Sequence, residues 1–181
     1  DSAVYAALPH LAPLLAWLQD RPSHVVAVVD RVGADIMVYE RGATEPITTV
    51  VTGPDDEIER NAPGGPSQMR YQHRAEDSWK HNAGLVAETL VRELRRADAR
   101  LLLLAGDVRA LQYLEEQLPA RARHEVLIRR VSGGRSPDGS EFRRAEQIKH
   151  ETRLAADEER ALLLKELAEG RGPGRRAVVG L

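Results

Sequence analysis

The strongest constraint on the fold of this chain is a short apolar run, His24–Val29, in which four of the six residues are valine. β-Branched side chains favour strands. Because neighbouring residues of a strand point to opposite faces, a run without polar alternation has to be covered on both sides. The sequence therefore predicts a buried, central strand here, in a sheet that carries helices on its faces.

Two further β-rich segments, 35–40 and 47–52, follow this run at hairpin distance. Short glycine-containing turns separate the three segments, which predicts an antiparallel meander. Beyond it, apolar residues recur every three or four positions, a spacing typical of helices, and predicted helices alternate with strands. The expected ranges of these later elements are helix 67–97, strand 101–104, helix 108–119, strand 125–131 and a long polar helix, 142–169.

The resulting order, β-β-β-α-β-α-β-α, predicts an α/β fold with a mixed five-stranded sheet, similar to the ribonuclease H-like architecture. The helix at 67–97 is expected to pack across one face of this sheet. Its apolar stripe contains Trp79, Val86, Leu90 and Leu94.

The two ends of the chain differ in composition from its centre. Leucines at helical spacing predict a lead-in helix within 1–22, and the folded unit is expected to span 23–170. Residues 171–176 have the composition of a linker, so 171–181 is interpreted as a linker and the start of a following domain. Because the chain begins with Asp1 and ends in an apolar stretch, we expect a piece of a longer protein with flanking domains.

Charge and cysteine content exclude several classes of function. The 26 basic residues nearly balance the 28 acidic ones, so any nucleic-acid contact has to be local. The absence of cysteine removes thiolate metal sites and cysteine nucleophiles, and it agrees with a cytoplasmic location. No apolar run reaches the ~18 residues of a membrane span. We expect neither a membrane partner nor a cofactor.

The segment Pro63-Gly64-Gly65-Pro66-Ser67-Gln68 leads directly into the long predicted helix. The two glycines permit a close approach of the backbone to a large partner, and the prolines stiffen the loop. Ser67 is suited to cap the helix, which places Gln68 in the first turn, where free amides favour an anion. The donors that follow could hold phosphates, and the tyrosine could stack on a base. These residues are Arg70, Tyr71, Gln72, His73 and Arg74.

This loop and helix start resemble the middle domain of the archaeo-eukaryotic class 1 peptide release factor and Pelota superfamily, and more narrowly its bacterial branch, which includes relatives of the hibernation factor Balon. The resemblance covers residues 24–170. It implies a factor that binds the ribosome and the tRNA acceptor end in ribosome rescue, hibernation or peptide release. It also implies catalytic roles for Gly64, Gly65 and Gln68, and RNA binding by Ser67 and the five residues that follow from Arg70 to Arg74.

The loop departs from the family's Gly-Gly-Gln pattern, because Pro66 and Ser67 separate the glycines from Gln68. Catalysis by a positioned group tolerates little displacement. The sequence therefore favours a role in binding the tRNA end, with hydrolysis of peptidyl-tRNA as an open alternative. Residues 54–66 hold few large apolar side chains, and we expect this loop to be exposed and mobile.

A second hypothesis is a metal-dependent nuclease, since two-metal cleavage needs acidic residues clustered at strand ends. Asp30, Glu76 and Asp107 are the candidates, although Asp30 is also suited to cap a turn and Asp107 to cap a helix. A third hypothesis is an interaction domain without chemistry of its own. Arginines around the last strand indicate either a second RNA-backbone patch or an ordinary solvated edge: Arg121, Arg123, Arg129, Arg130 and Arg135.

Overall fold

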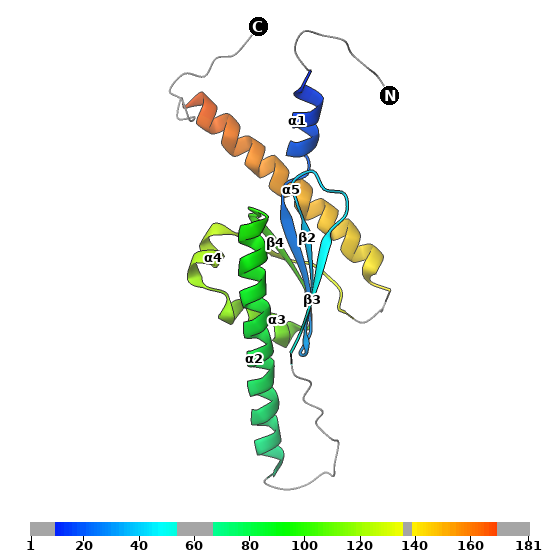
Figure 1. The fold of residues 1–181 in the computed structure, drawn as a ribbon, viewed down its shortest axis with the longest axis vertical. Coiled ribbons are helices and arrows are strands. Elements are labelled where there is room, and N and C mark those ends of the chain that lie inside the picture. The colour runs from blue at the N-terminus through cyan, green and yellow to red at the C-terminus, as the bar shows by residue number, and fades with distance from the viewer. Residues whose placement is uncertain (1–9, 54–66, 136–138, 170–181) are drawn as a thin grey trace.

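The computed structural model describes residues 10–53, 67–135 and 139–169, with side chains given from Glu76 onward in the long central helix. Figure 1 shows the arrangement of the helices and strands. In chain order they are α1 (Ala12–Gln19), β1 (His24–Val29), β2 (Gly33–Tyr39), β3 (Ile47–Thr52), α2 (Ser67–Arg96), β4 (Leu101–Gly106), α3 (Val108–Gln117), α4 (Ala120–Glu125), β5 (Leu127–Arg130) and α5 (Glu141–Ala168).

The five strands form one mixed sheet in the order β3-β2-β1-β4-β5. β2 runs antiparallel to β1 and to β3, whereas β4 runs parallel to β1 and to β5. The predicted central position of β1 is confirmed, and all six of its residues are buried. The predicted α/β class with a mixed five-stranded sheet is confirmed as well.

The larger part of the core lies between the sheet and the helices α2 and α3. β1 contributes Val25, Ala27 and Val29 to this side, because alternate residues of a strand share a face. α2 covers them with Val86, Leu90 and Leu94, each at most 4 % exposed. The predicted packing stripe is confirmed for these three residues. It is wrong for Trp79, which is only half-buried.

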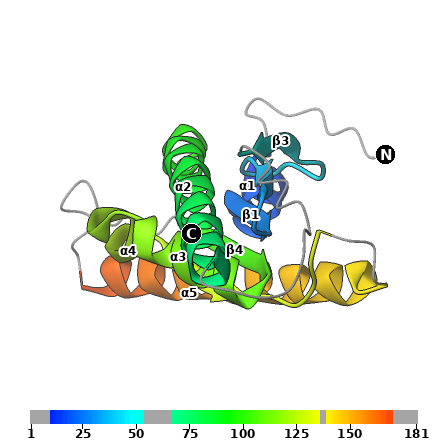
Figure 2. The same ribbon diagram turned by 90° about the horizontal axis from the view of Figure 1, so that it is seen from below.

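The opposite face of the sheet is covered by α5. Val26 and Val28 of β1 and Leu103 of β4 point to this side, where Ile148 and Ala155 pack against them. Since Ala156 is the one buried residue in the described helix α5, the contact is narrow. Figure 2 shows α5 running along one side of the molecule. The sheet therefore lies between one deeply packed helix pair and one long polar helix.

The short helix α4 (Ala120–Glu125) was not predicted, and β5 begins at Leu127 rather than at residue 125. Six residues are too few to show a helical repeat, and Pro119, the residue before α4, marked only the end of the preceding helix. None of the helices in the described ranges combines the length and the apolar character needed to cross a membrane.

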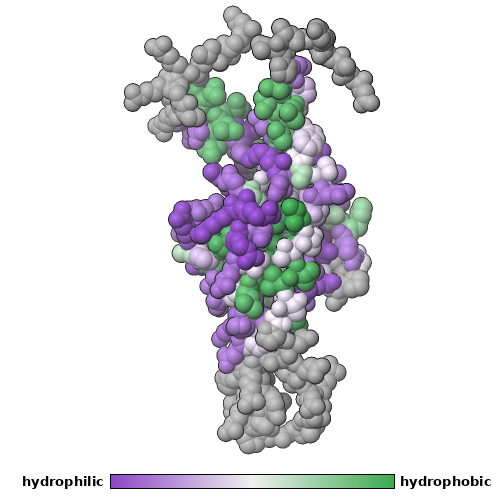
Figure 3. Space-filling model, in the orientation of Figure 1, coloured by the Kyte–Doolittle hydropathy of each residue, from purple (hydrophilic) through white to green (hydrophobic). Residues whose placement is uncertain are grey.

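Exposed leucines gather at one end of the molecule, on α1 and on the last turns of α5 (Figure 3). The range 1–22, in which a lead-in helix was predicted, contains the helix α1, and no residue of α1 is buried. The exposed leucines at this end are Leu11, Leu14, Leu15, Leu162, Leu163, Leu164 and Leu167.

Candidate functional site

The predicted site residues lie at the start of α2 and in the segment before it. Gly64 and Gly65 lie outside the described residues, as does the expected mobile loop at 54–66. The seven remaining residues have a helical backbone, and their side chains are outside the described part of the chain. They are Ser67, Gln68, Arg70, Tyr71, Gln72, His73 and Arg74. Their assigned roles stay predictions.

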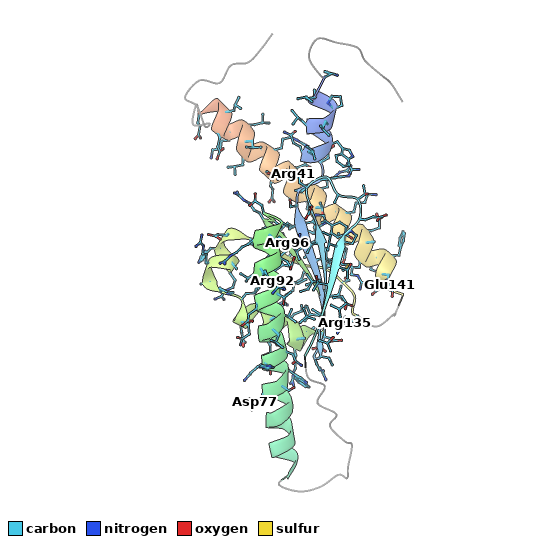
Figure 4. The ribbon with its side chains drawn as sticks, viewed as in Figure 1. Arg41, Asp77, Arg92, Arg96, Arg135 and Glu141 are labelled. Carbon is cyan, nitrogen blue, oxygen red and sulfur yellow. The ribbon has the colours of Figure 1, made fainter. Side chains whose placement is uncertain are left out.

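The first turns of α2 project beyond the sheet (Figure 1). Asp77 lies on this projecting part, well away from the strands (Figure 4). Within the side chains described from Glu76 onward, Asn82 is the first buried residue of the helix. Among the described side chains of α2, burial in the core therefore begins at Asn82.

The Asn82 side chain joins the three segments that meet at the base of the projecting helix. It is 3 % exposed, and its Nδ2 donates a 3.0 Å hydrogen bond to the Arg31 carbonyl oxygen in the turn between β1 and β2. Gly53, the residue after β3, packs directly against it, because a Cβ at Gly53 would collide with the Asn82 amide. The Gly53 amide also donates to the Val32 carbonyl, at 2.8 Å. Asn82 thus fixes α2 relative to the strand end from which segment 54–66 departs.

Arg31 adds a second contact at the same place. Its guanidinium carbon lies 4.6 Å from the centre of the Trp79 ring, one helical turn before Asn82. A long ion pair of 3.4 Å joins Arg31 to Asp107. Trp79 thus packs against the Arg31 guanidinium at the surface and not against the core. This is why the prediction that Trp79 is buried is wrong.

Gly53→Ala is expected to lower the free energy of unfolding by about 1–3 kcal/mol, because the added methyl group has no space beside Asn82. Urea denaturation of the variant measures the effect. Gly134→Ala serves as the control, since an added Cβ there meets no atom within 4 Å. A Gly53→Ala protein as stable as the Gly134→Ala protein would contradict the described anchoring.

The nuclease hypothesis required Asp30, Glu76 and Asp107 to converge on a metal ion. Asp30 accepts 2.8 Å hydrogen bonds from the amides of Val32 and Gly33, so it caps the turn after β1. Asp107 caps α3 by accepting from the amides of residues 109 and 110. In the described part of the chain, no three His, Cys, Asp or Glu side chains are grouped closely enough to hold a metal ion. The described residues therefore give the nuclease hypothesis no site of this kind.

Ion pairs occupy most of the predicted arginine patch. Arg135 joins Asp30 and Asp35 at 3.0 Å each, and the hydrogen bond that it donates to the Asp35 carboxylate raises the pKa of Arg135. Figure 4 shows Arg135 at the end of the sheet from which α2 projects. The remaining pairs are Arg130–Glu115 at 2.7 Å, Arg121–Glu125 at 2.7 Å and Arg129–Glu151 at 3.7 Å. The arginine side chains of this patch are therefore largely engaged in ion pairs.

Sequence reasoning did not single out Asn82 or Gly53. A signal was present, because Asn82 is a polar residue on the apolar stripe of α2, three positions after Trp79 and four before Val86. A polar residue at such a position has to find a buried partner, which here is the Arg31 carbonyl.

The sequence model of the bacterial archaeo-eukaryotic release factor family 2 matches residues 23–173. Two uncharacterized proteins of Mycobacterium tuberculosis, Rv2629 of strain H37Rv and MT2704 of strain CDC 1551, are each 32 % identical over 114 residues. These matches span 62 % of this chain but only 30 % of each relative. The crystal structure of an archaeal translation termination factor is 15 % identical, with a TM-score of 0.43 over 83 % of this chain and 42 % of that one.

Proposed function

This chain belongs to the bacterial archaeo-eukaryotic release factor family 2, a translation-related family, and on that premise we propose that the protein binds the ribosome and the tRNA acceptor end through the loop Gly64-Gly65-Pro66-Ser67-Gln68. The observation that carries the proposal is the family match over residues 23–173, which includes this loop and the whole of α2. The setting in the cell is the cytoplasm, in ribosome rescue, hibernation or peptide release.

The projecting helix supports a role in reaching into a partner. α2 begins at Ser67, and its first buried described residue is Asn82. At ~1.5 Å per residue, the stretch between these two residues is long enough to carry the loop roughly 20 Å beyond its anchor. A narrow site in a large partner can therefore receive the loop while the sheet stays outside.

The residue types after the loop suit the end of an RNA. Arg70 and Arg74 are four residues apart, a spacing that places them on one face of a helix, where both can contact phosphates. Tyr71 can stack on an unpaired base, a contact that does not depend on sequence. Phosphate contacts position the domain, and stacking selects a single-stranded end such as that of tRNA.

The loop sequence favours binding of the tRNA end without hydrolysis of peptidyl-tRNA. Pro66 has no amide hydrogen, so it removes one backbone donor that could stabilise an oxyanion. The Gln68 amide at the helix start remains available as a donor, because the first amides of a helix lack intrahelical partners. We therefore assign a role in positioning the tRNA end to Gly64, Gly65 and Gln68. Catalysis is the alternative role of these three residues.

Sucrose-gradient sedimentation of the natural full-length protein with ribosomes tests the proposal. The wild-type protein is expected to sediment with ribosomes, and Arg70→Ala/Arg74→Ala is expected to weaken the association by about tenfold or more, because two phosphate contacts are lost. Arg143→Ala on α5 is the matched control and should sediment like the wild type. Sedimentation of all three proteins away from ribosomes would refute the proposal.

Release of labelled peptide from ribosome-bound peptidyl-tRNA separates binding from catalysis. We expect the wild-type protein to release no more peptide than a reaction without protein. Gln68→Ala is expected to bind ribosomes like the wild type. Release above that level which disappears in Gly64→Ala/Gly65→Ala would instead assign hydrolysis to the loop.

A further inference from the structure

A groove of about 730 Å³ lies between the start of β1, the end of β2 and helix α5. It is on the face of the sheet opposite α2, the helix that follows the proposed tRNA-binding loop in sequence. Its volume is within the range of roughly 300–1,000 Å³ that is usual for small-molecule sites.

Two stacked rings, His24 and Tyr39, line the groove. They face each other across β1 and β2, with ring centres 4.5 Å apart and planes within 6° of parallel. Burial lowers the pKa of His24, whose Nδ1 lies 2.9 Å from the Pro22 carbonyl oxygen, so the imidazole is neutral near pH 7. The two rings therefore form an uncharged aromatic surface.

Tyr39 is the ring that a ligand can reach. His24 is 8 % exposed and lies between Tyr39 on β2 and Leu101 on β4, whereas Tyr39 is half-buried. The turn at Ala43 and Thr44, which follows β2, forms part of the groove wall. A planar group can therefore continue the stack on the Tyr39 side.

The charges around the groove are arranged for an anion. Lys149 and Arg153 lie four residues apart on α5, and neither forms an ion pair with any residue in the described ranges. Like charges at this spacing repel each other, and a bound anion would relieve the repulsion. The two carboxylates of the lining, Asp20 and Asp157, are both occupied by Arg160, at 2.7 Å and 2.9 Å. The groove is thus locally cationic in a chain of net charge −2.

We propose that this groove binds a nucleoside phosphate, with its base stacked on Tyr39 and its phosphate held by Lys149 and Arg153. The combination of an aromatic surface and unpaired cations at the two sides of one cavity fits a ligand that is planar at one end and anionic at the other. The ligand is either a free nucleotide or one nucleotide of a single-stranded RNA, because both present the same base and phosphate.

Isothermal titration of the full chain with adenosine monophosphate, adenosine, inorganic phosphate and a hexa-adenylate RNA tests this proposal. Adenosine monophosphate is expected to bind more tightly than adenosine or phosphate, since each of these lacks half of the recognised ligand. Hexa-adenylate binding more tightly than the mononucleotide would identify RNA as the source of the ligand, and equal binding would identify a free nucleotide.

Variants of the lining residues test the phosphate contact and the base contact separately. Lys149→Ala/Arg153→Ala is expected to weaken binding of the monophosphate by about tenfold or more. Arg143→Ala, on the same helix outside the groove, should have no effect. Tyr39→Phe should keep the preference for the monophosphate over phosphate, and Tyr39→Leu should remove it.

Three results would overturn the proposal: no binding of the mononucleotide or of the RNA at about 1 mM, unchanged affinity in Lys149→Ala/Arg153→Ala, or an equal loss of affinity in Arg143→Ala. Circular dichroism of each variant confirms that it is folded, and Lys149 and Arg153 are exposed, so their replacement leaves the core intact. Because the groove lies on the sheet face opposite α2 and its described lining includes none of the residues 64–74, failure here leaves the ribosome-binding test unaffected.

Discussion

Gly106→Ala is expected to lower the free energy of unfolding by roughly 2–5 kcal/mol, because the new Cβ would meet both strain and a backbone clash. Gly106 ends β4 with φ of +134°, a conformation that residues with a Cβ rarely adopt. Its Cβ would also collide with the carbonyl oxygen of Val29 in the neighbouring strand β1. That same oxygen accepts a 3.1 Å hydrogen bond from the Asp107 amide at the start of α3. Urea denaturation measures the loss.

Gly84→Ala is the matched control for this substitution. Gly84 lies inside α2, and a Cβ added there meets no atom within 4 Å. Alanine is favoured over glycine in a helix, so this variant is expected to be more stable than the wild type by about 0.5–1 kcal/mol. The two glycines should therefore respond in opposite directions. A loss of stability in both variants, or in neither, would contradict the backbone geometry described for the end of β4.

The central strands were predictable because their residues allow only one environment. His24–Val29 and Leu101–Gly106 are apolar on both faces, and a strand of this kind has to lie inside a sheet that is covered twice. β3 was predicted with its observed bounds, Ile47–Thr52, since these residues form a β-branched run after a glycine-containing turn. Each of these predictions depends on residues adjacent in sequence.

Features that depend on contacts between distant residues were not predictable in this way. Trp79 has the spacing of a core residue, but it lies outside the core cluster between α2 and the sheet, and Arg31 is the neighbour that it meets. Periodicity reports which face of a helix is apolar, and it does not report where the sheet beneath it ends. The helix α4 is shorter than two helical turns and gave no periodic signal.

The two candidate sites differ in the same way, since one rests on neighbouring residues and the other on contacts between distant ones. The loop at 64–68 was identified from neighbouring residues, because a family motif is a local pattern. The groove unites Tyr39 with Lys149 and Arg153, which are more than a hundred residues away in sequence. A single histidine in an apolar strand was the one local sign of it, and a histidine of this kind is ordinarily a satisfied core residue. Only the pairing of β1 with β2 and the position of α5 reveal the cavity.

Leu90→Ala is expected to lower the free energy of unfolding by about 2–5 kcal/mol, since it removes buried carbon atoms and leaves a cavity between α2 and the sheet. Leu90 is 0 % exposed and lies in the same cluster as Val25 and Leu104. Leu164→Ala on α5 removes the same atoms from a helical leucine that is 63 % exposed, so its effect should stay within about 0.5 kcal/mol. Urea denaturation of both variants gives the difference. Because helix propensity changes equally in the two, that difference isolates burial against the sheet, and equal losses would mean that α2 is not packed there.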